Sequence, residues 1–219
     1  MTQRVTNKLI PLLLPVLLGC SADPMDEPAD VTLDWRHAGG SHASAKYAAL
    51  DQIDGTNFAD LEVAWRYKSP DLQLAQGLAY ATADYRAVPL VIDGTLYVNS
   101  NHGQVSALDP ASGEELWVFD PQSYLTGSPI QTNIMIRGIE FWTDGEIQRL
   151  FIATLGKQLI SIDIDTGQPD PNFGDNGFVD LRSDLGRLEF DTNLLTSVSS
   201  PIAFLTSLFL AFSLFFFFI

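Results

Sequence analysis

The acidic run Asp163-x-Asp165-x-Gly167-x-x-Asp170 is the part of the sequence whose residue types and spacing come nearest to metal chemistry. Carboxylate oxygens are the ligands that calcium prefers, and alternate acids before a glycine are typical of a calcium-binding loop. An EF-hand also needs a third oxygen ligand before the glycine and a glutamate six residues after it. Neither is present, so we expect the run to form only a turn.

Other arrangements that carry familiar catalytic chemistry are missing from the sequence. It contains no Gly-x-Gly-x-x-Gly pattern, no P-loop and no Ser-His-Asp arrangement. We expect His37 and His42 to be exposed rather than catalytic. The single cysteine, Cys20, excludes an intrachain disulfide and a cysteine-based zinc site.

The cysteine ends a segment that is typical of a secretory signal. Two cations precede an apolar run, and the Leu-Leu-Gly-Cys sequence that ends at Cys20 resembles the lipobox of bacterial lipoproteins. We therefore expect residues 1–19 to be a signal peptide and Cys20 to be lipidated. A short membrane anchor is the alternative, although the run is short for a membrane span. Ser21 favours sorting to the outer membrane, so the expected location is periplasmic and membrane-anchored.

The charge of the chain excludes one large class of partners. Twelve Lys and Arg residues stand against 27 Asp and Glu residues, which gives a formal net charge of −15. An acidic surface repels phosphate backbones, so we expect no nucleic acid partner. Residues 20–33 are rich in proline and acids, and we expect them to be an unfolded acidic tether.

The elements that follow the tether have the period of strands. Residues 88–100 form two β-rich runs around Asp93-Gly94, which is a strong hairpin signal. Further strand candidates are residues 61–67 and 115–119.

A repeat supports an all-β fold. The turn that contains Gly113 recurs at Gly167, and the β-rich runs before it recur at the same offset, 167 − 113 = 54 positions. Repeated units of three or four strands suit the blades of a β-propeller. The WD40 class is excluded because its period is about 40–45 residues and its repeats end in Trp-Asp.

Residues 107–117, ALDPASGEELW, combine a small residue, an acid, a turn and an aromatic ring. Ala107 lets a neighbouring sheet approach, Asp109 accepts backbone N–H bonds, Gly113 helps to make the turn, and Trp117 packs between sheets. The pattern resembles the tryptophan-docking motif of the quinoprotein dehydrogenases. These are eight-bladed propellers that use pyrroloquinoline quinone (PQQ) and a calcium ion.

Two further segments carry the same resemblance. They are Arg137-Gly138-Ile-Glu-Phe-Trp142 and residues 34–67. The second copy of the docking motif lacks the tryptophan, but its continuation through residues 173–181 is similar to the membrane glucose dehydrogenase branch. The resemblance covers roughly residues 34–201. It implies that residues 34–200 form the N-terminal portion of a quinoprotein β-propeller, with about two blades.

The resemblance also implies cofactor contacts. Arg137 stands where an arginine of the family helps to hold PQQ, and a guanidinium fork suits the three carboxylates of this cofactor. A structural ion pair is the alternative for Arg137. His102 matches a histidine near the cofactor, with a solvated loop as the alternative. Arg86 replaces a Glu or Gln that touches the cofactor, and Ser199 falls near the Thr-Ser-Pro-Pro segment of the family.

The implied function is that of a PQQ-dependent oxidoreductase acting on the CH–OH group of a sugar, polyol or alcohol. Electrons would pass to a membrane quinone or a cytochrome. In the family the catalytic aspartate and the main calcium ligands lie in later blades. We therefore assign no catalytic residue and no metal ligand, and we expect the 219-residue chain to be inactive.

A different class of protein fits some of the same features. A cofactor-free propeller lipoprotein resembling the scaffold subunit of the outer-membrane barrel-assembly machinery shares the lipid anchor and the docking motif. It would bind partners along its strand edges. The N-terminal segment and the Arg-Gly-x-x-x-Trp pattern favour the dehydrogenase, because a scaffold does not need them.

Residues 201–219 are an apolar tail rich in phenylalanine and without charge. By length this tail is close to a membrane span. The sequence leaves three alternatives: a C-terminal membrane anchor, an out-of-frame reading, and a pair of buried strands.

Overall fold

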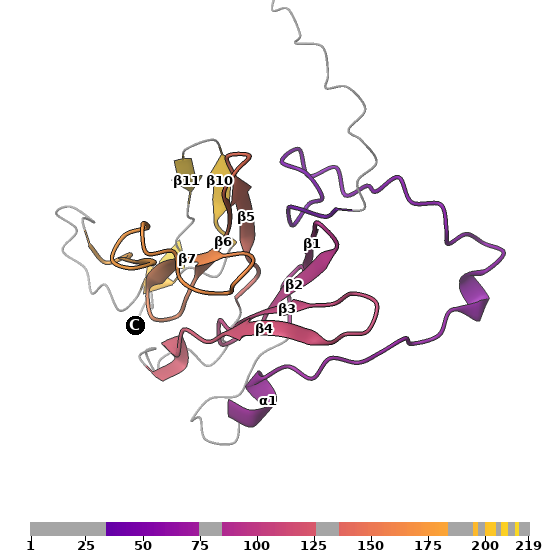
Figure 1. The fold of residues 1–219 in the computed structure, drawn as a ribbon, viewed down its shortest axis with the longest axis horizontal. Helices are drawn as coiled ribbons and strands as arrows, with labels where there is room; N and C mark the ends of the chain where they lie inside the picture. Colours follow the sequence, from indigo (N-terminus) through magenta and orange to yellow (C-terminus); the bar gives the residue numbers. More distant parts are fainter. Residues whose placement is uncertain are drawn as a thin grey trace, which may run out of the picture. The chain divides into compact units, whose positions relative to one another are not determined.

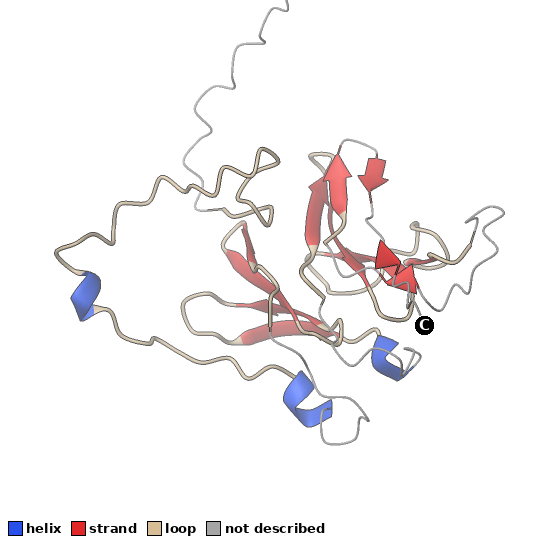
Figure 2. Ribbon diagram, turned by 180° about the vertical axis from the view of Figure 1, so that it is seen from behind, coloured by secondary structure: helices blue, strands red, loops and turns tan. Residues whose placement is uncertain are grey.

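The computed structural model describes residues 34–74, 85–125, 136–183, 195–196, 200–204, 207–209 and 213–214. They belong to one compact unit, Leu33–Ile219. Strands are the main regular elements of this unit (Figure 2), and its described helices are short: η1 (Phe58–Asp60), α1 (Asp71–Leu74) and η2 (Ser123–Leu125). Within the described residues, no helix has both the length and the apolar character that crossing a membrane requires.

The first sheet is an antiparallel meander of four strands in the order β1-β2-β3-β4 (Figure 1). Its strands are β1 (Leu90–Ile92), β2 (Thr95–Asn99), β3 (Val105–Leu108) and β4 (Glu115–Phe119). The turn between β1 and β2 is Asp93-Gly94, and both residues have positive φ angles, 48° and 79°. Such angles are typical of a two-residue hairpin turn, so the predicted hairpin is confirmed.

The second sheet repeats this architecture in the order β5-β6-β7-β8. Its strands are β5 (Glu140–Thr143), β6 (Gln148–Ala153), β7 (Gln158–Asp163) and β8 (Phe178–Asp180). A four-stranded antiparallel meander is the unit of a β-propeller blade. The described residues therefore form two blades of an incomplete propeller, as the repeat predicts.

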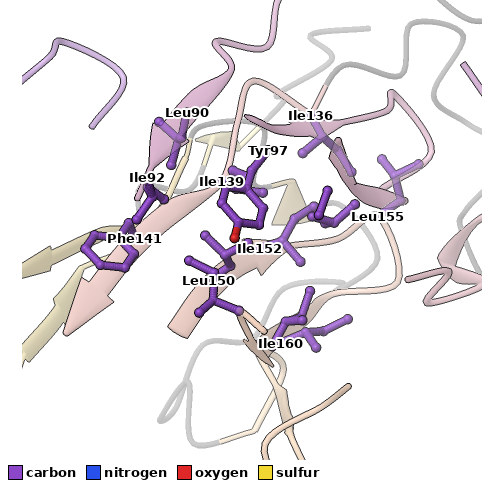
Figure 3. Packing of buried hydrophobic residues seen from close by; sticks show 14 residues of the cluster. Leu90, Ile92, Tyr97, Ile136, Ile139, Phe141, Leu150, Ile152, Leu155 and Ile160 are labelled. Atoms are coloured by element: carbon purple, nitrogen blue, oxygen red, sulfur yellow. The ribbon is translucent and has the colours of Figure 1, made fainter. Parts of the chain in front are cut away.

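One hydrophobic core joins residues of both sheets (Figure 3). Leu90, Ile92 and Tyr97 come from the first sheet, and Leu150 and Ile160 come from the second. Strand β3 is buried along its whole length and β7 along its central residues, so both faces of these two strands are covered. This burial fixes the loops between the strands, which carry the candidate site.

The prediction of a strand over residues 61–67 is wrong. The backbone there is not assigned to a strand, because none of the described strands pairs with it. Side chains attach the segment to the first sheet instead: the Tyr67 hydroxyl donates to Glu115 Oε2 at 2.8 Å and shares a 2.9 Å hydrogen bond with Ser106 Oγ. Burial raises the pKa of Tyr67 to about 12.

The described part of the tail forms short antiparallel strand pairs. β10 (Ile202–Phe204) pairs with β11 (Ser207–Phe209), and β12 (Ser213–Leu214) pairs with β9 (Leu195–Thr196). β10 also lies against β5. The strands pair as the third alternative expects, but Ile202 is exposed and Ala203 is buried, so the burial that this alternative also requires stays a prediction.

Candidate functional site

Two tryptophans make equivalent contacts with the turns of the two sheets. A Cβ atom on Gly167 would lie 2.6 Å from the ring of Trp117, and one on Gly113 would lie 2.6 Å from the ring of Trp65. Each indole Nε1 donates to the backbone carbonyl three residues before the glycine, at 3.1 and 3.0 Å. A glycine is required at both positions, because a side chain would occupy the space of the ring.

The turn of the first sheet is organised by one carboxylate. Asp109 Oδ1 accepts the backbone N–H groups of Ala111 and Ser112, at 2.9 and 2.7 Å, and the Ser112 hydroxyl at 2.9 Å. The bonds from Ser112 hold the pKa of Asp109 below its ordinary value. The motif residues therefore shape the turn on which Trp65 lies.

The acidic run of the second sheet forms the predicted turn. Asp163 Oδ1 accepts the backbone N–H and the hydroxyl of Thr166, at 3.0 and 2.9 Å. Arg149 bridges two of the acids, since its Nη1 lies 2.9 Å from Asp163 Oδ2 and its Nε lies 2.9 Å from Asp170 Oδ2. Asp163 and Asp170 thus make structural contacts within this sheet, as expected of a run that forms a turn.

The loop between β2 and β3 holds a buried acid–histidine pair. His102 is fully buried, and its Nδ1 lies 3.0 Å from Asp71 Oδ1. Asp71 also accepts the backbone N–H of Asn101 at 2.9 Å. Burial by itself would raise the pKa of Asp71, but hydrogen bonds from His102 and Ser100 outweigh it and keep this pKa below the ordinary value.

His102 is therefore not a solvated loop residue. Its ring lies edge-on to Tyr124, with 5.8 Å between the ring centroids. The carboxylate and the aromatic ring hold the imidazole inside the loop. In this position His102 can fix the shape of the loop.

Hydrogen bonds join the segments that carry the predicted cofactor residues. Nδ2 of Asn99, the last residue of β2, donates to Ile136 O at 3.1 Å, which ties the start of the β2–β3 loop to the segment before β5. The N–H of Val88 donates to the carbonyl of Arg137 at 3.3 Å, which ties the segment of Arg86 to that of Arg137. Three of the four predicted positions thus lie on segments that hydrogen bonds join.

Gly138 marks a close approach at the same place. A Cβ atom there would lie 2.5 Å from Ser200 Oγ, so the segment before β10 lies against the segment before β5. Ser199, the fourth predicted residue, lies outside the described residues, and so does Cys20.

Arg137 and Arg86 are the charged groups of this cluster, and both are exposed. A guanidinium group donates paired hydrogen bonds to carboxylates. Two such groups on adjoining backbone fit a ligand that carries several carboxylates. PQQ has three, so the residues present fit the cofactor that the sequence implies.

The histidines of the N-terminal segment differ from expectation in one case. His42 is exposed as predicted, but His37 is partly buried. Its Nδ1 lies 3.1 Å from Oε1 of Glu140, which is buried on β5. The prediction of an exposed His37 is wrong, because it did not include this partner from a distant strand.

Sequence reasoning missed Asp71 and Glu140 altogether. Asp71 lies in a four-residue helix without any surrounding motif, and Glu140 occupies a strand position that reads as ordinary. Neither acid has neighbours in the sequence that distinguish it from an ordinary surface acid, so the sequence does not identify its partner.

Comparisons with known proteins agree with this geometry. Residues 35–211 match the family described as PQQ glucose/ethanol/alcohol dehydrogenase, β-propeller domain, so the match extends into the predicted apolar tail. The chain is 30% identical over 175 residues to the quinoprotein glucose dehydrogenase of Gluconobacter oxydans, covering 74% of this chain and 21% of that protein. It is 32% identical over 136 residues to the 1-butanol dehydrogenase (cytochrome c) of Thauera butanivorans, covering 62% and 18%.

A solved structure gives the same result. The quinohemoprotein alcohol dehydrogenase of Pseudomonas putida HK5 aligns with a TM-score of 0.63 and 25% sequence identity, over 82% of this chain and 23% of that chain. The chain thus spans about a fifth of the length of the relatives that it matches. The match favours the dehydrogenase over the cofactor-free scaffold.

Proposed function

The chain belongs to the PQQ glucose/ethanol/alcohol dehydrogenase β-propeller family, and from this premise we propose that it supplies the N-terminal blades of a PQQ-dependent dehydrogenase. The substrate class is a sugar, a polyol or an alcohol. The electron acceptor is a quinone or a cytochrome, and one relative carries cytochrome c in its name. The observation that best supports this proposal is the exposed Arg137. Its backbone is hydrogen-bonded to Val88, and the next residue, Gly138, lies against Ser200.

Within this proposal each residue has a definite task. Arg137 and Arg86 hold carboxylates of the cofactor, Gly138 lets the segment of Ser200 pack against that of Arg137, and Asp71 and His102 keep the β2–β3 loop in shape. PQQ, when bound, supplies the two-electron oxidation of the hydroxyl group. The chain's own residues bind and orient, and we assign to them neither the catalytic base nor the calcium ligands.

We place the protein in the periplasm, held to the membrane through a lipid on Cys20. The lipobox-like sequence before this cysteine supports the assignment, and Ser21 favours the outer membrane. A periplasmic location suits electron transfer to a membrane quinone or to a cytochrome. The acidic net charge agrees with partners other than nucleic acid.

The test is a titration of the purified chain with PQQ, followed by quenching of tryptophan fluorescence. Arg137→Ala should weaken binding about tenfold, since it removes a charge-assisted hydrogen bond to a carboxylate. Arg66→Ala is the matched control, because Arg66 is exposed and lies outside the cluster, and it should leave binding unchanged. Equal affinity of wild type and Arg137→Ala would refute the assignment.

The same preparation tests the second part of the proposal. With PQQ, calcium and glucose or an alcohol supplied, we expect no dye reduction above a heat-treated sample, because no catalytic base is assigned to these blades. Substrate-dependent reduction by the 219-residue chain would show that a complete site is present.

A further inference from the structure

Three side chains that the proposed function does not use converge at one point. His37 and His42 belong to the N-terminal segment, and Glu140 is the first residue of β5. One ligand atom from each lies within 4.8 Å of the other two. The rings of His37 and His42 are 3.9 Å apart between centroids, so the two imidazoles are direct neighbours.

The burial of Glu140 makes this cluster chemically unusual. The residue is 4% exposed, and its Oε1 lies 3.1 Å from His37 Nδ1 and 3.4 Å from the N–H of Ala203. A buried carboxylate needs compensation of its charge or a set of hydrogen bonds. A cation would compensate Glu140 more completely than one imidazole, and it would also use the second imidazole that lies beside the first.

The loop that carries the two histidines is folded back on itself. The N–H of Gly40 donates to His37 O at 2.7 Å, and the N–H of Lys46 donates to Gly39 O at 2.8 Å. Gly40 has a φ angle of 82° and lies against the ring of Trp35. Trp35 forms a bridge with Val91 of β1. The loop is therefore held in the shape that brings His42 back toward His37.

The types of donor atom select the class of metal. Calcium and magnesium take oxygen ligands, whereas two imidazoles with one carboxylate are a donor set of zinc. Zinc bonds to nitrogen and oxygen of about 2.0 Å place tetrahedral ligand atoms about 3.3 Å apart. Atoms that lie within 4.8 Å of one another must come closer by up to about 1.5 Å to reach this arrangement, a shift that a rotation of the exposed His42 ring can supply in part.

We propose that His37, His42 and Glu140 form a Zn²⁺ site. The exposed side of the cluster, at His42, leaves the fourth position for water. The ion joins the N-terminal segment to β5, two parts of the chain whose ligands His37 and Glu140 are 103 positions apart. It thereby fixes the N-terminal segment on the blades. The proposal does not rest on the dehydrogenase function, because it uses other residues.

The experiment is a calorimetric titration of the full chain with zinc chloride, and in parallel with calcium chloride. The protein carries no histidine tag, and Cys20→Ser removes the one thiol, so imidazoles and carboxylates are the remaining strong ligands. His42→Ala is the main variant, because an exposed loop residue can be changed without disturbing the core. Glu140→Gln is the second variant, and the exposed Glu146→Gln is its matched control.

We expect one zinc ion per chain and no comparable calcium binding. His42→Ala and Glu140→Gln should each weaken zinc binding by roughly tenfold or more, because losing a ligand costs at least as much as losing an outer-shell partner, and Glu146→Gln should not change it. Zinc should also raise the thermal unfolding midpoint of the parent protein but not that of His42→Ala. Unchanged zinc affinity in His42→Ala, or no zinc binding at all, would leave only a His37–Glu140 pair and overturn the proposal.

Discussion

The β2–β3 loop and the β6–β7 loop are closed by the same backbone hydrogen bond at corresponding positions of the repeat. In the first, the N–H of Ser100 donates to Gln104 O at 2.8 Å, and in the second the N–H of Thr154 donates to Gln158 O at 2.8 Å. Both loops contain a residue with positive φ one position before the glutamine. The repeat therefore fixes the course of the chain in both blades.

The side chains between the ends of these two loops differ. The first loop buries His102 against Asp71, whereas the second places Leu155 in the hydrophobic core. A turn closed by backbone hydrogen bonds does not depend on the side chains between its ends. The residues between the hydrogen-bonded ends of these loops can therefore vary without changing the blade. In the first blade they make polar contacts beside the candidate cofactor residues.

The largest expected difference between the two regions lies in the docking contacts. Trp117 stands on β4 and packs against the core of both sheets, but Trp65 stands on a segment that pairs with none of the described strands. Trp117→Ala should lower the free energy of unfolding by about 3 kcal/mol, at the low end for a large aromatic residue. Trp65→Ala should cost about 1 kcal/mol, close to the loss of one hydrogen bond.

Urea denaturation monitored by circular dichroism measures both values. Trp117→Phe is the control, since it keeps an aromatic ring near Gly167 but loses the indole N–H bond and part of the packed ring area. It should fall between wild type and Trp117→Ala. Equal losses in the free energy of unfolding for Trp65→Ala and Trp117→Ala would mean that both tryptophans stabilise the fold equally, which would contradict the expected difference between the two contacts.

Local patterns in the sequence predicted much of the framework. The Asp93-Gly94 hairpin, β4 and the repeat were all accessible, because turn residues and strand periodicity are encoded within a few positions. The failure at residues 61–67 has the opposite cause. A strand needs a partner, and strand propensity in a short segment does not reveal whether one is present.

The candidate site was predictable only in part. Arg137 and Arg86 were found through a family pattern, and the structure connects their segments through the Val88 hydrogen bond. The Asp71–His102 pair and the His37–Glu140 pair join residues that are distant in sequence and carry no local motif. Tertiary packing creates such pairs, so a single sequence holds no direct signal for them.

A smaller effect is expected from the buried acid of the first loop. Asp71→Asn should lower the free energy of unfolding at pH 7 by about 1–2 kcal/mol, because it weakens hydrogen bonds to a charged group. The pKa of Asp71 is lowered in the folded state, so its contribution is present above the ordinary Asp value of about 3.9 and is lost as the pH falls through the folded value. The difference between wild type and variant should therefore shrink in acid.

Urea titrations at neutral and at acidic pH test this dependence. Asp51→Asn is the control, because Asp51 is exposed and, like Asp71, lies within residues 34–74. It should leave stability unchanged at both pH values. A difference between wild type and Asp71→Asn that stays constant from neutral to acidic pH would show that the carboxylate does not stabilise the β2–β3 loop through its charge.

The smallest difference is expected at the two turns, where the geometry is nearly the same. The hydroxyls of Ser112 and Thr166 each donate to an aspartate at 2.9 Å, but Asp163 is also held by Arg149, whereas Asp109 accepts bonds only from within its turn among the described contacts. Ser112→Ala should therefore lower the urea midpoint slightly more than Thr166→Ala, and both should change it less than Asp71→Asn. Thr166→Ser keeps the hydroxyl and should match wild type. A larger loss from Thr166→Ala would show that Arg149 does not share in holding the second turn.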